Sequence, residues 1–312
     1  MLRFLVAKLT RAFLAILFVV TFAFVVLRLS GDPALMILGP ETTPEALAAF
    51  RKSWGLDAPV WQQFLGYLGN LTEGRFGQSM RDARPAIDVV MERVPITLWL
   101  MLPALALKIL LGVPAGVLAA LKRNSTLDRA IMTFSVMGYA VPNFVLGIFL
   151  ILIFAVQLGW LPSSGSATWA HLILPVIVLG TAGAGILARF TRSAMLEVLG
   201  QPYVRTAVAK GVPWWRVVNW HALPNAAIPT VTVIGFMMGS LIAGAVVTES
   251  VFAWPGLGRA LVVAVSNRDL AVVQVILLLV AACMVTSNLI VDMLYGWLDP
   301  RTRIPKAGVG GG

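Results

Sequence analysis

The residues of this chain that could do chemistry are few, and several lie inside long apolar runs. The polar side chains of those runs are Lys108, Asn143, Asn288 and Asp292, together with small hydroxyl groups. Ionisable groups inside a membrane mark substrate paths and proton relays. Carriers driven by protons or sodium need such carboxylates, and Asp292 is the only clear one in these runs. Lys108 is therefore a candidate path residue, and unchanged transport in a Lys108→Met variant would remove it from the path.

A polar and basic loop lies between two apolar runs at residues 203–224, YVRTAVAKGVPWWRVVNWHALP. Gly211 interrupts it, and Pro213 suits the first position of a new helix. The pattern predicts two short helices that present a shaped surface on the aqueous side. Because the loop holds no catalytic cluster, we expect another protein to dock there.

Enzymatic function classes find no support in the sequence. It contains no GxxxxGK[ST] phosphate-binding loop, no HExxH, no CxxC and no GxSxG element. The two histidines, His171 and His221, fall on opposite sides of the membrane in the topology below. We therefore expect no catalytic residue, no metal and no cofactor, and ATP hydrolysis must come from a partner.

The elements that position these residues are membrane helices. The 312 residues are 59% hydrophobic and 12% charged, with a mean hydropathy of +0.87. A span needs about 20 apolar residues, and runs this continuous exclude barrel strands. The sequence predicts an all-α membrane protein with six spans, at residues 12–27, 96–121, 131–158, 172–188, 228–248 and 270–295.

Two of these runs carry further expectations. The third is long enough that it must tilt or end early. The fourth is short and contains Gly180, Gly183 and Gly185. Small residues let helix backbones approach closely, so we expect this run to contact other helices rather than lipid.

The net charge of +10 has a topological explanation. With the N-terminus inside, most of the excess lysine and arginine falls in the inside segments, as the positive-inside rule requires. The prediction is a multi-pass protein with cytosolic N- and C-termini, and the charge calls for no nucleic-acid partner. Cys283 is the single cysteine and forms no internal disulfide.

An outer segment follows the first span. Thr42 and Glu45 have capping-box spacing, so a helix is expected to start there. A second helix is expected over residues 60–71, and Pro85 opens a third. That third helix is predicted to carry Ile87, Val90, Met91 and Val94 on one side. This small helical cap could shield the span ends or dock an outside partner, and both readings stay open.

The chain is thereby divided into four parts: the N-terminus with the first span (1–30), the outer helical segment (31–95), a core of five spans (96–298) and a cytosolic tail (299–312).

The basic loop resembles the cytoplasmic coupling loop, or EAA loop, of ATP-binding-cassette (ABC) importer permeases. In that pattern a glycine stands six positions after the first motif residue, and Leu-Pro follows the glycine by 12 and 13. Gly211, Leu223 and Pro224 match these offsets. Residues 205–207 read RTA where EAA would stand, and YVRTAVAKG resembles the YVRTARAKG of the dipeptide/oligopeptide permease subfamily.

Further strings along the chain are similar to the same subfamily. They are GDPA at 31–34, GLDAP at 55–59, GRFGQS at 74–79, LGWLP at 158–162, ARFTR at 188–192, ESVFAWPGLG at 249–258, NLIVD at 288–292 and LDPR at 298–301. The ordered set covers nearly the whole chain.

The resemblance implies the type I ABC importer permease fold in a bacterial inner membrane. Its implied partners are a second homologous permease, two ABC ATPase subunits and an outer solute-binding protein. The implied ATPase-coupling residues are Tyr203, Arg205, Thr206, Ala207, Lys210, Gly211, Leu223 and Pro224. Tyr203, Val204 and Ala207 would seat in the ATPase, Arg205 and Lys210 would pair with its acids, and a bulky residue at Gly211 would uncouple transport.

The outer string ESVFAWPGLGR carries a second set of candidate residues. Pro255 and Gly256, with Gly258, predict a turn between the fifth and sixth spans. The resemblance implies an outer re-entrant segment near the gate, with Glu249 and Trp254 lining the path. Candidate gate or path residues are therefore Glu249, Trp254, Pro255, Gly256 and Lys108.

Two other function classes stay open at this point. A self-sufficient carrier or channel would need binding or ion-coupling groups within the spans, and these are scarce. A membrane scaffold would explain the hydrophobicity but not the loop. Substrates implied by the resemblance are dipeptides, oligopeptides, glutathione or nickel chelates, and the strings at 39–41 and 79–85 resemble glutathione-type permeases slightly more.

Overall fold

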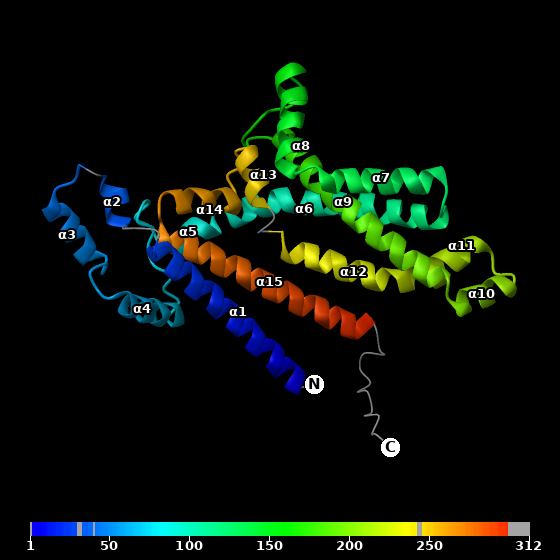
Figure 1. Cartoon of the computed structure of the whole chain (residues 1–312), viewed down its shortest axis with the longest axis horizontal. Helices are drawn as coiled ribbons and strands as arrows, with labels where there is room; N and C mark the ends of the chain where they lie inside the picture. The colour runs from blue at the N-terminus through cyan, green and yellow to red at the C-terminus, as the bar shows by residue number, and fades with distance from the viewer. Residues whose placement is uncertain (1, 30–32, 40, 242–244, 299–312) are drawn as a thin grey trace. The chain divides into compact units, whose positions relative to one another are not determined.

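The structure is a computed structural model that describes residues 2–29, 33–39, 41–241 and 245–298 (Figure 1). The predicted tail at 299–312 lies outside this range, and so does the side chain of Asp292. The chain forms two compact units. The first comprises residues 1–98 and 242–285, and the second comprises residues 99–241 and 286–312.

The first unit contains both long and short helices. They are α1 (Leu2–Leu29), α2 (Pro33–Leu38), α3 (Pro44–Ser53), α4 (Val60–Thr72), α5 (Ala86–Met91), α13 (Val246–Val251) and α14 (Leu257–Ser266), with the first residues of α6 (Val94–Leu121) and most of α15 (Leu270–Leu298). Among the described residues, the one β-type pairing is an isolated bridge between Gln78 and Pro85. The predicted all-α class is confirmed.

The start of α3 differs from the expected one by a residue. Thr43, not Thr42, is the N-cap: its backbone is extended (φ −63°, ψ 145°) and its hydroxyl accepts from the Ala46 N–H at 3.4 Å. The Thr42 hydroxyl instead donates to the Leu38 carbonyl at 2.6 Å. Pro44 fills the first helical position, where its missing N–H costs nothing.

The core of the first unit joins α5, α14 and α15. Its buried side chains include Val90 of α5, Leu257 of α14 and Ile276 of α15. Ile87 and Val94 pack against this cluster, as their spacing predicted, whereas Met91 is 50% exposed. The expected apolar side of the third outer helix is therefore correct except for Met91, since Val94 beyond it packs against the cluster again.

The second unit is built on one long helix, α9 (Ala170–Leu199). Its other elements are the rest of α6 and α15, α7 (Thr126–Ala140), α8 (Asn143–Leu150), the π-helical segment η1 (Ile151–Gln157), α10 (Pro202–Ala209), α11 (Trp214–Arg216), the π-helical segment η2 (Val217–Ala222) and α12 (Leu223–Gly239). α7 and α12 both pack along α9 and flank it in Figure 1.

The glycines of α9 allow this packing. A Cβ on Gly180 would lie 2.5 Å from Leu107 Cδ2, and one on Gly185 would lie 2.6 Å from the Ser135 carbonyl oxygen. A Cβ on Gly183 would lie 2.5 Å from Lys108 Cδ. Real Cβ atoms do not come so close, so the predicted role of these glycines in close helix contact is confirmed.

The span-length helices differ from most of the predicted runs. The first run, at 12–27, corresponds to a shorter apolar helix over Phe13–Val26, and the helix of the second run begins at Ala86. Within the described residues, four helices are long and apolar enough to cross a membrane, and a fifth is added if α7 and α8–η1 form one span. That pair bends by 95°, because Pro142 lacks an N–H and holds Val141 in an extended conformation (ψ 118°). The third run is therefore not one straight helix, and the six-span count stays a prediction.

The fourth and fifth runs also have other ends. α9 continues past residue 188 to Leu199, because arginines are good helix formers and do not end a helix. The helix that corresponds to the fifth predicted run covers Trp214–Gly239, so it starts earlier and ends earlier than residues 228–248.

Candidate coupling loop and outer turn

The loop at residues 203–224 begins with α10, whose ends are both defined by local sequence. Pro202 occupies the first turn, and the Thr206 hydroxyl donates to the Pro202 carbonyl at 3.0 Å. At the other end Gly211 has φ +80°. Its N–H bonds to the Val208 carbonyl at 2.9 Å, and the next N–H bonds to the Ala207 carbonyl at 3.2 Å. These two bonds form a Schellman motif, which explains the glycine.

The face that α10 offers to solvent differs from the expected one. Val204 is only 2% exposed, and α10 packs on η2, so Val204 belongs to the interior of the second unit and not to a docking face. Tyr203 is 44% exposed and Val208 is 48% exposed. Arg205 and Lys210 are exposed as predicted. Partial burial raises the pKa of the Tyr203 phenol, so this ring is a neutral group on a basic surface.

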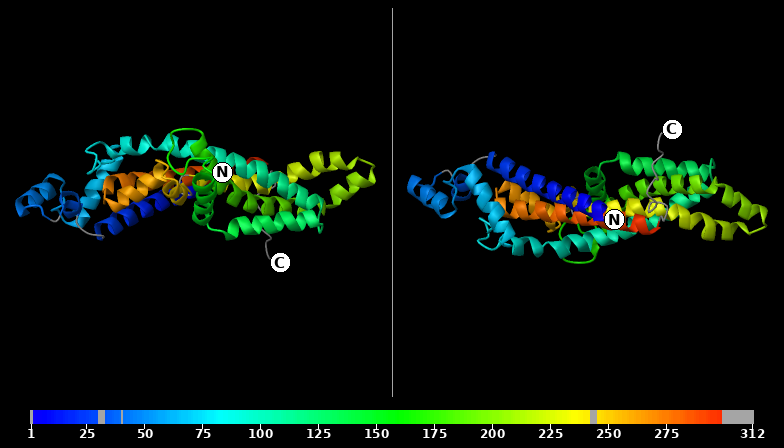
Figure 2. Two further views of the ribbon diagram at one scale, coloured as in Figure 1. Left: turned by 90° about the horizontal axis from the view of Figure 1, so that it is seen from above. Right: turned by 90° about the horizontal axis from the view of Figure 1, so that it is seen from below.

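The second half of the loop is not a separate short helix. Pro213 is the N-cap of α11 (φ −60°, ψ 140°) rather than its first helical residue. From Trp214 the chain runs without a break through α11, η2 and α12 to Gly239. Leu223 and Pro224 are the first residues of α12, so both motif residues lie inside this continuous helix. Figure 2 shows α10 and α11 together at one end of the α9–α12 pair.

The continuous helix is fixed to α9 by a small apolar cluster. Val218, Ala222 and Ala226 pack with Ala194 and Met195 in this cluster, all at most 7% exposed. The tryptophans of the loop point the other way: Trp214, Trp215 and Trp220 are 53%, 56% and 73% exposed. Exposed aromatic residues are typical of protein interfaces.

An ion pair that the sequence analysis missed lies beside this loop. Arg192 of α9 donates to both carboxylate oxygens of Asp128 in α7, at 2.6 and 2.7 Å. Asp128 is 3% exposed, and the Asn124 N–H also donates to it at 2.9 Å. The available signal was Ser125, which caps α7 three residues before Asp128. Sequence spacing did not connect that carboxylate to an arginine 64 residues away.

The outer turn of the first unit is organised around a buried carboxylate. Glu249 has no exposed surface. Its Oε1 accepts from the Thr97 hydroxyl at 2.7 Å, and its Oε2 accepts from the Arg259 N–H at 3.0 Å. The Thr97 hydroxyl oxygen in turn accepts from the Leu257 N–H at 2.7 Å. The carboxylate thus ties α6 to the start of α14.

Trp254, Pro255 and Gly256 complete the turn. Trp254 is 1% exposed, and its indole N–H donates to the Ile96 carbonyl at 2.9 Å. The Pro255 carbonyl accepts from Arg93 at 3.2 Å. A Cβ on Gly256 would collide with the carboxylate of Glu249. Positive φ falls on Ala253 (φ +49°), so the glycines of this turn serve close approach rather than backbone rotation.

The candidate path residues therefore fall into two groups. The structure brings Glu249, Trp254, Pro255 and Gly256 together in the first unit. The side chains of Glu249 and Trp254 are buried there. Lys108 lies in the second unit, partly buried, with its aliphatic stem over Gly183. Their role in a path stays a prediction.

The chain matches two family descriptions that cover most of its length. Residues 112–304 match "Binding-protein-dependent transport system inner membrane component", and residues 1–101 match the N-terminal part of such a membrane component. The chain is 45% identical over 290 residues to the glutathione transport system permease protein GsiC of Shigella flexneri serotype 5b. It is 44% identical over 290 residues to GsiC of Escherichia coli strain K12, and each alignment covers 93% of this chain and 94% of the relative.

Solved structures show the same fold at lower identity. The chain resembles the inward-facing MetNI methionine ABC transporter in its native CY5 crystal form with a TM-score of 0.56 and 19% identity, covering 69% of this chain and 98% of that chain. A second crystal form of the same transporter, a SeMet soak, matches with a TM-score of 0.57 and 20% identity, and the match covers 67% of this chain and 95% of that chain. Together with the all-α architecture, the sequence matches lead to one assignment: this chain belongs to the inner-membrane components of binding-protein-dependent transport systems, the permeases of ABC importers.

Proposed function

We propose that this chain forms half of the translocation path of an ATP-driven importer of small peptides, and that residues 203–224 receive the motion of the ATPase subunits. The observation that carries the proposal is the construction of the loop. A short exposed helix, α10, is separated by a glycine-dependent cap from a helix that is long and apolar enough to span a membrane. Displacement of α10 and α11 would therefore reach the span-length helix directly.

The proposed docking face combines exposed aromatic and basic side chains. Tyr203, Arg205, Lys210, Trp214 and Trp215 are all exposed. Rings of this kind supply buried apolar area at an interface, while the two cations favour an acidic partner surface. Thr206, Ala207, Gly211, Leu223 and Pro224 would shape the loop rather than touch the partner.

The full assembly in this proposal contains a second homologous permease, two ABC ATPase subunits and an outer solute-binding protein, with both termini of this chain in the cytosol. Because relatives at 44–45% identity are named glutathione transport permeases, the proposed substrates are glutathione-like peptides. Glu249, Trp254, Pro255, Gly256 and Lys108 remain proposed gate or path residues.

Co-purification with reconstituted uptake tests the proposal. We expect the chain to be isolated in a stable complex with two ATPase chains, and proteoliposomes with that complex to take up peptide only with ATP and the binding protein present. Peptide uptake by the purified chain alone would contradict it and support a self-sufficient carrier. A matched control is Arg75→Gln, since Arg75 is an exposed cation paired with Glu73 in the outer segment. It should leave ATPase association unchanged, whereas Arg205→Gln should weaken it.

A further inference from the structure

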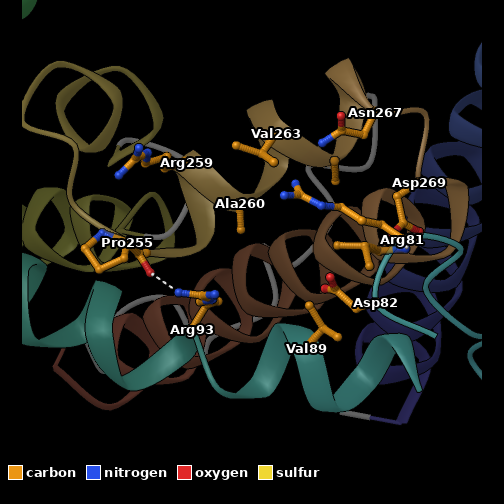
Figure 3. A pocket seen from close by; sticks show the side chains of 13 residues that line it. Arg81, Asp82, Val89, Arg93, Pro255, Arg259, Ala260, Val263, Asn267 and Asp269 are labelled. Atoms are coloured by element: carbon orange, nitrogen blue, oxygen red, sulfur yellow. Dashed lines mark hydrogen bonds between the residues drawn. The ribbon is translucent and has the colours of Figure 1, made fainter. Parts of the chain in front are cut away.

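The first unit contains a cavity to which no function has been given above, and residues of the outer turn form part of its wall. It has a volume of about 320 Å³ and lies between the loop before α5, the start of α6 and α14 (Figure 3). Cavities of this size accept small molecules. All of its walls belong to the first unit.

Three arginines line this cavity from three different segments of the chain: Arg81, Arg93 and Arg259. Two are held in place by carbonyl groups of the outer turn. Arg93 donates one bond to the Pro255 carbonyl at 3.2 Å, and Arg259 donates one to the Ala253 carbonyl at 2.6 Å. A guanidinium has five N–H donors, so most of the donors stay available. In Figure 3 the Arg81 side chain extends into the cavity toward Ala260 and Val263.

The acids of the cavity do not neutralise these cations. Within the part of the chain that the structure describes, none of the three arginines forms an ion pair. Asp269 is buried and accepts from the Ser79 hydroxyl, so it serves to fix the loop. Asp82 is exposed, and its carboxylate has no hydrogen-bond partner among the described residues. The cavity therefore offers several cationic donors and one exposed carboxylate, Asp82, which accepts no hydrogen bond from the described residues but interacts electrostatically with Arg84.

We propose that this cavity binds the carboxylate groups of a small acidic peptide, with Arg81, Arg93 and Arg259 as donors and Asp82 facing the peptide ammonium group. Arginine guanidinium groups match carboxylates in geometry and charge. The proposal rests on the proposed function, because it makes the cavity a contact for the transported peptide on the outer side of the membrane. The half-open, concave shape favours a small ligand over the flat surface of a docking protein.

The test measures ligand binding to the intact transporter complex in lipid nanodiscs, without binding protein and without ATP. The probes are reduced glutathione and the dipeptide Ala-Glu, with glutathione diethyl ester as the ligand control. We expect both acidic peptides to bind, the diester to bind at least tenfold more weakly, and added salt to weaken binding. Arg81→Gln and Arg93→Gln should each raise the dissociation constant about tenfold, the loss expected for one hydrogen bond to a charged group.

Arg75→Gln is the matched control, since Arg75 is an exposed arginine of the same outer segment, does not line the cavity and pairs with Glu73. It should bind like the wild type. Unchanged thermal unfolding and basal ATP hydrolysis identify variants that remain folded, and Arg93→Lys should recover part of the binding.

Three outcomes would overturn the inference: no binding of either acidic peptide, equal binding of the diester, or wild-type binding by Arg81→Gln and Arg93→Gln. A fourth would also do so, namely variants that lose affinity for the binding protein whatever its ligand, because the cavity would then be a protein contact. ATP-driven uptake by the same preparations separates the two proposals. Normal uptake without peptide binding at the cavity would refute only the proposed cavity site. Absence of ATP-driven uptake would refute the proposed function.

Discussion

Gly211 offers a sharp test of the coupling loop, because steric and conformational effects separate there. A Cβ at this position would meet nothing within 4 Å, so a substitution creates no collision. The backbone, however, has φ +80°, which costs an L-residue about 1–2 kcal/mol. That cost lowers the ratio of the native loop conformation to its alternatives by about 5- to 30-fold.

The order of substitutions follows from this separation. Asn tolerates the left-handed region better than other non-glycine residues, so Gly211→Asn should have the smallest effect. Gly211→Ala should be intermediate, and the β-branched Gly211→Val should be worst, since its stiff side chain is least compatible with positive φ. The two hydrogen bonds of the Schellman motif, at 2.9 and 3.2 Å, would be lost together with the native φ.

The assay is the number of ATP molecules hydrolysed per peptide imported by the complex in proteoliposomes. We expect this ratio to rise in the order Asn, Ala, Val while the complex stays assembled. A matched control is Gly66→Ala. Gly66 lies within helix α4, its φ is not positive, and a Cβ there would meet nothing within 4 Å. Identical ratios of ATP hydrolysed to peptide imported for all three Gly211 variants would refute the reasoning. A higher ratio for Gly211→Asn than for Gly211→Ala would show that side-chain size, not φ, controls the loop.

Three further predictions concern packing and charge. Arg192→Ala leaves the carboxylate of Asp128 buried and unpaired, so it should lower the free energy of unfolding by about 1–3 kcal/mol in a thermal-unfolding measurement, and the double variant with Asp128→Ala should recover part of this loss. Gly183→Leu should lower the unfolding temperature of the detergent-solubilised chain because it collides with the stem of Lys108, and adding Lys108→Ala should restore it. An unchanged temperature in the single variant would contradict this packing. Glu249→Gln should fold with nearly wild-type stability, since the amide keeps the shape of the carboxylate and can still accept a hydrogen bond from a backbone N–H. Glu249→Ala should lower the free energy of unfolding by about 1–3 kcal/mol. Equal losses for the two variants would show that the hydrogen bonds of Glu249 do not contribute to stability.

Much of this fold could be predicted from composition and local punctuation. Apolar runs identified the membrane helices, and proline and glycine signals located the outer helices to within a residue or two. The early end predicted for the fourth run has a simple cause, which is that a hydropathy profile ends a helix at the first charge. α9 continues past Arg189 because the helical hydrogen bonds of its backbone do not depend on the side chain facing lipid or water.

The contacts around the candidate sites could be predicted only in part. The sequence predicted the two helices that flank Gly211, but burial of Val204 depends on how α10 packs against η2. The Asp128–Arg192 pair and the three arginines of the cavity join segments far apart in the sequence. A single sequence, read without comparison to others, carries no signal for such pairings.

The π-helical segment η2 has a consequence for how the loop and the membrane helix are oriented about their common axis. Successive residues of an α-helix are rotated by about 100°, and a π turn accommodates one residue more than an α turn. Removing one residue from Val217–Ala222 would let the helix return to α geometry without shortening any contact of α12. Because the extra residue is held within one wide turn, the residues on either side would keep their angular positions, whereas removing a residue from a regular α-helical part of Trp214–Gly239 would swing everything N-terminal to it by about 100° around the axis. η2 thus lets this helix hold one residue more while Trp214 and Trp215 keep their angle to the packed face of α12.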